Sequence, residues 1–498
     1  MTYTLGIDIG TFESKGVLVD ASGEIIAQAA RPHEMIVPRA GWAEHDPDQD
    51  WWGDFVFLSQ TLLHDSGIDP RAIKAVGCSA IGPCMLPVDK DGNALMNGVL
   101  YGVDNRASVE VDELTAAIGE DTLLRRCGNA LTSQSVGPKI LWLKRNHPEI
   151  FAQTDKIHTS TTYITRKLIG RTVIDHYTAA NFSPLYDVET QDWTTELTDQ
   201  IVDRDLLPEI LWSSEIAGEV TREAAAQTGL AAGTPVMTGT IDAVAEAVSV
   251  GVLSPGEMMM MYGSTIFIIM PTAERVRDPR LWYAPWLFEG QHASMAGLAT
   301  SGTLTHWFRD RFAQELSREE AFPVLAREAE ASPPGANGLI LLPYFSGERT
   351  PIHDPLAKGT LMGLNLTHSR GDIYRAMLEG IALGTGHVIE AYRDCGAAPD
   401  ALFAVGGGTK NRVWSQATSD VTGIAQTVRR RTIGASYGDA FLAALAIGDA
   451  KLEDIERWNP VERTIEPDAV HAALYTDRLA QFKRLYENNK DLMRELDA

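Results

Sequence analysis

The same short sequence pattern occurs twice in the chain: an apolar strand, a glycine turn with hydroxyl residues, and a second apolar strand. The first copy spans residues 5–20 with Gly10 and Thr11 at its turn, and the second spans 258–270 with Gly263 at its turn. Each copy predicts a β-hairpin whose turn carries no bulky side chain. Such a turn lets backbone amides approach an anion closely, and hydroxyl groups add donors. Two turns facing each other would hold a polyphosphate, although either hairpin alone is also a common structural element.

Asp8 lies inside the first of these strands. A carboxylate within a β-strand is disfavoured by packing, so its presence indicates a task such as holding a metal ion or the water shell of one. The first turn is followed by Lys15, and the second turn continues into Ser264 and Thr265. We therefore expect both hairpins to contribute to one phosphate site.

Size and composition indicate a multidomain globular protein. The chain has 498 residues, a hydrophobic content of 44% and a charged content of 22%, so two or three domains are expected. The net charge of −24 argues against nucleic acid or an anionic membrane as partner. The four cysteines form no CxxC pair, and no signal peptide is visible after Met1, which predicts a cytoplasmic protein with reduced thiols.

The order of hairpins followed by alternating strands and helices recurs in both halves of the chain. The economical interpretation is two α/β lobes with a cleft between them. A turn cluster near residues 253–256 separates the halves. We predict an N-terminal domain over 1–250, a C-terminal domain over 251–455, and a helical tail over 456–498 that packs back on the body.

Asp242 is the strongest candidate for a catalytic group. It follows an expected strand at 234–240 and stands in the first turn of an expected helix. Open α/β folds place reactive groups at such turns, and the helix dipole favours an ionised carboxylate there. The carboxylate could accept the proton of a substrate hydroxyl. The alternative is a simple helix-capping acid, which would stabilise the helix by about 0.3–1 kcal/mol.

A run of three glycines at 406–408 follows an expected strand at 401–405 and leads through Asn411 into a helix. Removing side chains from a surface suits close contact with a flat ring or a phosphate. A flexible strand–helix loop is the alternative, but three consecutive glycines would make it entropically costly. We therefore expect this glycine run to contact a ligand.

Two polar clusters could bind a sugar, which needs an aromatic face and bidentate polar partners, although each cluster alone is more often loop and helix-cap chemistry. One is the run Gly41-Trp42-Ala43-Glu44-His45-Asp46-Pro47, and the other is Asp104-Asn105-Arg106. The Asp46-Pro47 pair also predicts a helix start. No P-loop, dinucleotide fingerprint, HExxH or kinase HRD loop is present, and Gly77-Cys78-Ser79-Ala80-Ile81 lacks the last glycine of a nucleophile elbow.

Taken together, these residues resemble the FGGY carbohydrate kinase family over nearly the whole chain. The most specific match is the run 359–364 (GTLMGL) continued by 372–379 (DIYRAMLE). The run 345–351 (FSGERTP), followed by Asp354-Pro355, resembles the xylulose kinase branch closely.

The resemblance implies a pair of ribonuclease H-like, actin-like α/β domains that close over ATP, Mg²⁺ and a sugar. Asp242 matches the family's general base and Asp8 its metal-associated acid. The positions that match its phosphate and nucleotide contacts are Gly10, Thr11, Lys15, Gly263, Ser264, Thr265, Gly302, Gly407, Gly408 and Asn411. Those that match its sugar side are Gly41, Trp42, Glu44 and Asp104.

The implied reaction is transfer of the γ-phosphoryl group of ATP to a hydroxyl of a ketose, with D-xylulose as the first expectation. The run 79–83 (SAIGP) departs from the Gln-Met-His-Gly stretch usual in xylulose kinases, and Tyr101-Gly102-Val103 replaces the family's Trp before Asp104. Ribulose, erythritol and glycerol therefore stay open as substrates. An actin-like ATPase without a sugar acceptor and a catalytically silent sugar sensor are the alternatives from other classes. A homodimer is also left open.

Overall fold

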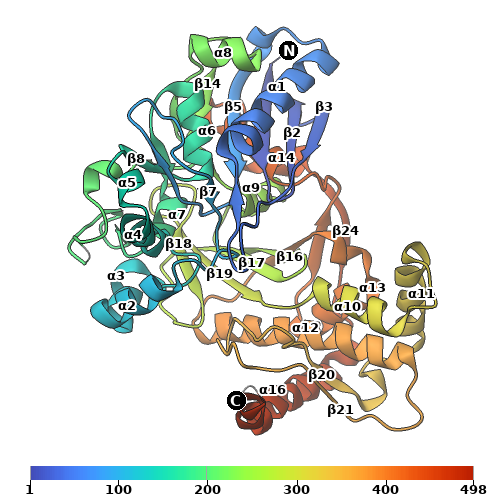
Figure 1. Ribbon diagram of the computed structural model, residues 1–498. Coiled ribbons are helices and arrows are strands. Elements are labelled where there is room, and N and C mark those ends of the chain that lie inside the picture. The colour runs from blue at the N-terminus through green and yellow to red at the C-terminus, as the bar shows by residue number, and fades with distance from the viewer. Residues whose placement is uncertain (1, 198, 497–498) are drawn as a thin grey trace. The chain divides into compact units, whose positions relative to one another are not determined.

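The computed structural model describes residues 2–197 and 199–496, which form two compact units (Figure 1). Unit 1 takes the described residues within Met1–Leu253, Tyr283–Ala293 and Ile433–Pro460. Unit 2 takes those within Ser254–Trp282, Ser294–Thr432 and Val461–Ala498. These units differ from the contiguous ranges expected from the sequence, because segment 433–460 packs with unit 1.

Unit 1 is built on a twisted sheet in the order β13-β14-β5-β1-β2-β3, with β15 also pairing with β5. Strands β1, β2 and β3 form an antiparallel meander, and β5 and β14 run parallel to β1 beyond it. The predicted hairpin is therefore present as β1 and β2. The strands are β1 (Tyr3–Ile9), β2 (Glu13–Asp20), β3 (Ile25–Pro32), β5 (Ile73–Ala80), β13 (Ile216–Glu219), β14 (Pro235–Met237) and β15 (Thr240–Ile241).

Shorter strand pairs and most helices of unit 1 surround this sheet. The short strands are β4 (Glu44–His45), β6 (Leu86–Val88), β7 (Gly98–Val99), β8 (Lys156–His158), β9 (Val173–Asp175), β10 (Tyr186–Asp187), β11 (Asp192–Trp193) and β12 (Glu209–Leu211). The helices are α1 (Gly53–Ser66), α2 (Ser108–Ile118), α3 (Glu120–Cys127), α4 (Val136–Asn146), α5 (Pro148–Phe151), α6 (Ser160–Ile169), α7 (His176–Ala179), α8 (Arg222–Thr228), α9 (Asp242–Ser249), α14 (Ala435–Ala446) and α15 (Ile455–Trp458).

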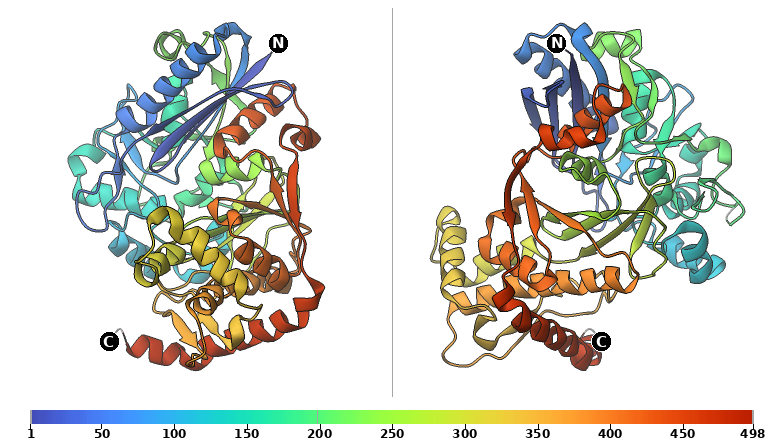
Figure 2. Two further views of the ribbon diagram at one scale, coloured as in Figure 1. Left: turned by 90° about the vertical axis from the view of Figure 1, so that its right-hand side faces the viewer. Right: turned by 180° about the vertical axis from the view of Figure 1, so that it is seen from behind.

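Helix α14 comes from far along the chain but lies against the N-terminal strands, as the orange-red helix beside the blue strands in Figures 1 and 2 shows. Three glycines allow this close approach. A Cβ atom at Gly6 would lie 1.9 Å from the Ser436 carbonyl oxygen, and one at Gly77 would lie 2.2 Å from the Asp439 carbonyl oxygen. A Cβ atom at Gly438 would lie 1.9 Å from the carbonyl oxygen of Ala245 on α9. Backbone therefore packs directly on backbone, which locks α14 to β1, β5 and α9.

The second unit repeats the topology of the first. Its sheet has the order β18-β19-β17-β16-β22-β23-β24, in which β16 and β17 form the second predicted hairpin and β22 and β23 run parallel to β16. The run β19-β17-β16-β22-β23 corresponds to β3-β2-β1-β5-β14 of unit 1. The strands are β16 (Glu257–Tyr262), β17 (Ile266–Thr272), β18 (Trp282–Pro285), β19 (His292–Leu298), β22 (Ala401–Val405), β23 (Gln426–Arg429), β24 (Val461–Ile465) and the separate pair β20 (Ile340–Leu342) and β21 (Thr360–Met362).

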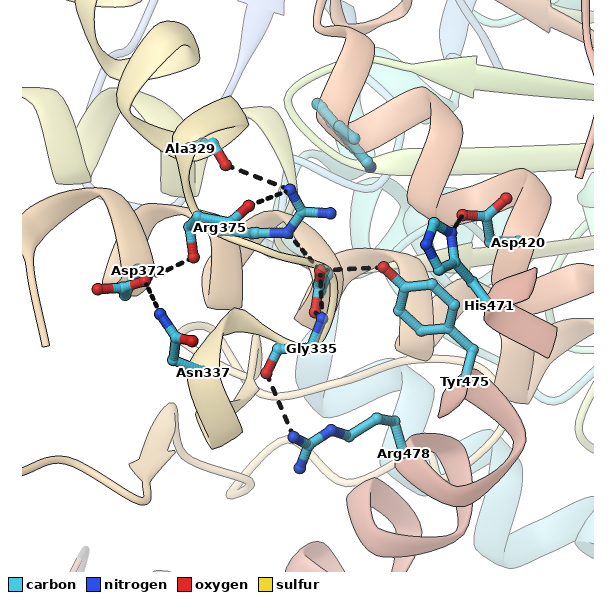
Figure 3. A network of polar contacts seen from close by, with 12 residues as sticks. Ala329, Gly335, Asn337, Asp372, Arg375, Asp420, His471, Tyr475 and Arg478 are labelled. Atoms are coloured by element: carbon cyan, nitrogen blue, oxygen red, sulfur yellow. Dashed lines mark hydrogen bonds and ion pairs between the residues drawn. The ribbon is translucent and has the colours of Figure 1, made fainter. Parts of the chain in front are cut away.

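Five helices complete unit 2: α10 (Gly302–Phe312), α11 (Arg318–Ala331), α12 (Arg370–Asp394), α13 (Arg412–Thr422) and α16 (Ala472–Glu495). Helix α16 is the predicted C-terminal helix, and it packs on α12, α13 and β20 (Figure 2). Buried polar contacts fix it, because Tyr475 donates to Glu379 of α12 at 3.0 Å and Glu379 also binds Arg375 at 2.7 Å (Figure 3). No helix among the described residues is long and apolar enough to cross a bilayer.

Candidate active site

The position of Asp242 follows from strand register in unit 1. Asp8 of β1 pairs with Ser79 of β5, and Ser79 pairs with Thr240 of β15. Gly239 makes the turn between β14 and β15 with a φ of 80°, a conformation that favours glycine. Asp242 follows two residues after Thr240 as the first residue of α9. Strands β1 and β15 both run parallel to β5, which pairs with each of them, so the predicted base and the predicted metal-associated acid lie at the same end of this part of the sheet.

Asp242 has the properties of a general base. Its Oδ1 accepts a hydrogen bond from the Ala243 backbone amide at 2.7 Å, which orients the carboxylate at the start of α9. Burial raises its pKa to about 6, and the Ala243 amide pulls the pKa in the opposite direction. A carboxylate with this pKa is ionised at neutral pH and is a better proton acceptor than an exposed aspartate.

Four acids of unit 1 share this region. Burial raises the pKa of Asp8 well above its usual value, and the charges of Asp242 and Glu246 raise it further. Burial likewise raises the pKa of Asp439, to which the charge of Asp8 adds, and raises that of Glu246 to about 7. Lys15, which pairs with Asp8 across β1 and β2, opposes the shift at both Asp8 and Glu246.

This excess of negative charge suits a cation. Within residues 2–197 and 199–496, however, no group of three or more His, Cys, Asp or Glu side chains is placed to hold a metal ion directly. A single carboxylate such as that of Asp8 could contact a cation only through the water shell of that cation.

Two members of the cluster are absent from the sequence predictions. Glu246 lies one turn after Asp242 on α9 and accepts a hydrogen bond from the Ala435 amide, so it caps the N-terminus of α14. Asp439 reaches the cluster from α14 and accepts a hydrogen bond from the Ser79 hydroxyl at 2.7 Å. Ser79 lies within β5, fully buried, so it is not a nucleophile elbow. Glu246 follows Asp242 by four residues and so shares one face of the expected helix, which is a local signal. The contact between Ser79 and Asp439 joins residues 360 positions apart, and no local motif could have revealed it.

Two histidines contact the backbone carbonyl oxygens of the turn at Gly10 and Thr11. Neither contact was predicted from the sequence. His33 Nε2 lies 3.0 Å from the Gly10 carbonyl oxygen, and His45 Nε2 lies 3.1 Å from that of Thr11. Burial opposes protonation of His33, but its hydrogen bond to Asp54 and the charge of that carboxylate raise its pKa. Carbonyl oxygens that are bound inside the protein do not repel a phosphate, so the turn suits anion binding.

Lys15 follows this turn on β2, and its amine lies 3.2 Å from the Glu13 carboxylate. The side chain is 44% exposed. It is therefore free to reorient toward a bound anion at small cost, because an exposed ion pair contributes little.

The second turn is organised in the same way in unit 2. The Gly263 carbonyl oxygen accepts from the Gly302 amide and the Ser301 hydroxyl, each at 3.0 Å. The Ser264 carbonyl oxygen accepts from Thr303. A Cβ atom at Gly302 would lie 2.4 Å from the Gly263 oxygen, so only glycine lets α10 begin this close to the turn.

The glycine loop links β22 to α13 through a 3₁₀ turn at Gly407–Lys410. A Cβ atom at Gly407 would meet nothing within 4 Å, whereas one at Gly408 would lie 2.6 Å from the Trp414 ring. The Asn411 side chain accepts from the Trp414 amide at 3.1 Å and caps α13. Gly407 therefore offers an open backbone surface, and Gly408 serves close packing.

A pocket of about 1080 Å³ borders the same 3₁₀ turn in unit 2. Thr409, Lys410 and Arg412 line it together with Arg375 and His471. Arg375 donates to the Ala329 carbonyl, and His471 contacts Asp420 (Figure 3).

The predicted sugar-side residues gather around one buried arginine of unit 1. Asp104 is fully buried and binds Arg106 through both carboxylate oxygens, and Glu44 binds the same guanidinium at 2.8 Å. The guanidinium carbons of Arg39 and Arg106 lie 3.7 Å and 4.0 Å from the centre of the Trp42 ring. The structure thus brings Trp42, Glu44 and Asp104 together around Arg106. Each of the three side chains already contacts this arginine.

Gly41 belongs to this network, and Tyr101 connects the network to the turn at Gly10 and Thr11. Gly41 adopts a φ of 78°, and its carbonyl oxygen accepts from the Asn105 amide at 2.8 Å. Tyr101 places its hydroxyl 3.2 Å from the Thr11 hydroxyl. The loop carrying Asp104 is therefore tied to the turn that contains Thr11.

Comparisons with known proteins agree with this architecture over the full chain. Residues 3–249 match the N-terminal domain, and residues 258–447 the C-terminal domain, of the FGGY family of carbohydrate kinases. The chain belongs to this family. It is 28% identical to a xylulose kinase of Bacillus subtilis, over 99% of this chain and 98% of that protein. It is 29% identical to a xylulose kinase of Escherichia coli, over 98% and 99% of the two chains.

A crystal structure of xylulose kinase from Rhodospirillum rubrum superposes with a TM-score of 0.93 at 31% identity, and 99% of each chain is covered. The predicted pair of ribonuclease H-like α/β domains is thereby confirmed. The protein is a sugar kinase that transfers a phosphoryl group from ATP to a hydroxyl group.

Proposed function

We propose that the protein phosphorylates a ketose at the expense of ATP, with D-xylulose as its substrate. The observation that carries this proposal is the full-length similarity to proteins described as xylulose kinases, together with a buried carboxylate, Asp242, at the site where a hydroxyl would be activated. The four cysteines have free thiols, which supports action in the cytoplasm.

In this reaction Asp242 orients the sugar hydroxyl and accepts its proton. Phosphoryl transfer requires little covalent work from the protein, so positioning and charge neutralisation dominate. Asp8 would hold the water shell of Mg²⁺, which neutralises phosphate charge when bound. Lys15 and the amides of the turn at Gly10 and Thr11 would bind phosphate oxygens.

Unit 2 would contribute the remaining nucleotide contacts. The turn at Gly263, Ser264 and Thr265 would bind phosphate, with Gly302 positioning it. The open surface at Gly407 would receive adenosine, with Gly408 and Asn411 fixing the loop. Trp42, Glu44, Asp104 and Gly41 would shape the sugar side, Asp104 by holding Arg106 in place.

Coupled detection of ADP across a sugar panel tests the substrate. D-xylulose should release ADP faster than D-ribulose, L-ribulose, erythritol or glycerol. A clear preference for another member would reassign the substrate while leaving the kinase chemistry intact. ADP release that no acceptor stimulates would instead favour an ATPase without a sugar acceptor.

Gly407→Leu tests the adenosine assignment. Because a Cβ atom there meets only open space, the variant should fold normally. Its side chain would fill the surface on which adenosine is expected to lie, so the Kd for ADP should rise about tenfold, equivalent to about 1.4 kcal/mol. The Kd for sugar should stay within about twofold. Titrations that show equal losses for both ligands would contradict the assignment.

A further inference from the structure

Asp439 and Asp8 meet through a single hydroxyl group. Ser79 Oγ lies 2.7 Å from Asp439 Oδ2 and 3.2 Å from Asp8 Oδ1. Ser79 is 0% exposed and Asp439 is 1% exposed. The close backbone contact of α14 with Gly77, next but one to Ser79, fixes this geometry.

A serine hydroxyl carries one proton and can give it fully to only one acceptor. When both carboxylates are ionised, they compete for the Ser79 proton, and the shorter contact gives Asp439 the larger share. Asp8 Oδ1 keeps lone pairs that are not taken up by a strong donor. A carboxylate in that condition is well suited to bind the waters of a hydrated cation.

We propose, on the basis of the kinase function above, that Asp439 is a positioning residue for Asp8: it draws the Ser79 proton away and so leaves Asp8 available to the hydrated metal. Asp439 itself touches neither metal nor substrate in this arrangement. Without its carboxylate, Ser79 would donate to Asp8 and compete with the metal's waters.

Binding of Mn²⁺ to the full chain in the presence of ADP, followed by electron paramagnetic resonance, tests the proposal without requiring turnover. Asp439→Asn should raise the Mn²⁺ Kd about 5- to 20-fold, because the amide is a weaker acceptor for the Ser79 proton. Ser79→Ala should change it by less than about threefold. In the Ser79→Ala background, Asp439→Asn should have almost no further effect, since no proton is left to redirect.

Ser436→Ala is the matched control. Ser436 lies one turn before Asp439 on α14, and its buried hydroxyl has no partner among the described residues. Thermal melting identifies variants that fail to fold, and Asp439→Ala replaces the asparagine variant in that case. An unchanged Kd in Asp439→Asn would overturn the proposal. Equal losses with and without Ser79 would overturn it too, because Asp439 would then act through its charge alone. Sugar-dependent ADP release by the wild type tests the proposed function separately.

Discussion

Asp242→Ala should lower kcat by about 10²–10⁴, equivalent to about 3–5 kcal/mol of transition-state stabilisation. Asp242 is oriented by the Ala243 amide at the start of α9, and burial makes its carboxylate a strong proton acceptor. The Kd for ADP should change by less than about twofold, because the role assigned to Asp242 concerns the sugar hydroxyl. Steady-state kinetics and ADP titration measure the two quantities.

Asp242→Asn is the isosteric control for shape. It should lose nearly as much activity as the alanine variant, since an amide cannot accept the proton. Turnover near the wild-type rate in either variant would remove Asp242 from the role of base.

The same assignment predicts the dependence of kcat on pH. The pKa of Asp242 is raised to about 6, so its base form is lost as pH falls through that value. We expect kcat to decline about tenfold per pH unit below pH 6 and to be nearly constant above pH 7. This acidic limb should be absent from the residual activity of Asp242→Asn.

Much of the fold was predictable because its signals are local. The two glycine-turn hairpins appear as β1–β2 and β16–β17, and the Asp46-Pro47 start is confirmed by the Asp46 side chain, which accepts from the Asp48 and Gln49 amides. Asp242 was recognisable because a strand, a glycine turn and a helix start occur in sequence within a few residues. Helix α11 was missed, and it contains Pro323, which disfavours helix.

The rest depends on contacts between distant segments. The sequence order places segment 433–460 in the C-terminal half of the chain. Its helix α14 nevertheless packs on β1, because Gly6 and Gly77 leave room for the helix backbone. Asp439 therefore reaches Ser79 across 360 positions of sequence. His33, which follows β3, and His45, which lies on β4, likewise support the turn at Gly10 and Thr11 from separate segments. No recognisable motif indicates these long-range contacts, so they could not be predicted from the sequence.

Gly6→Ala should strongly destabilise unit 1. The new methyl group would lie 1.9 Å from the Ser436 carbonyl oxygen and 2.6 Å from the Ala440 amide nitrogen, both backbone atoms that cannot rotate away. Helix α14 would have to move off β1, carrying Asp439 with it. We expect a loss of about 2–4 kcal/mol in the free energy of unfolding, since overpacking a rigid contact lies at the upper end of single-residue effects.

Differential scanning calorimetry should record this loss as a fall of about 5–15 °C in the first unfolding transition. Ser436→Ala tests the same interface without overpacking it, and it should stay within about 0.5 kcal/mol of the wild type because it removes only an unpartnered hydroxyl. A wild-type transition in Gly6→Ala would mean that α14 does not rest on β1 at the backbone distance described. In that case the Asp439 carboxylate would not be held near Asp8 through the Ser79 hydroxyl. The calorimetric result therefore also tests whether α14 positions Asp439 in the acid cluster.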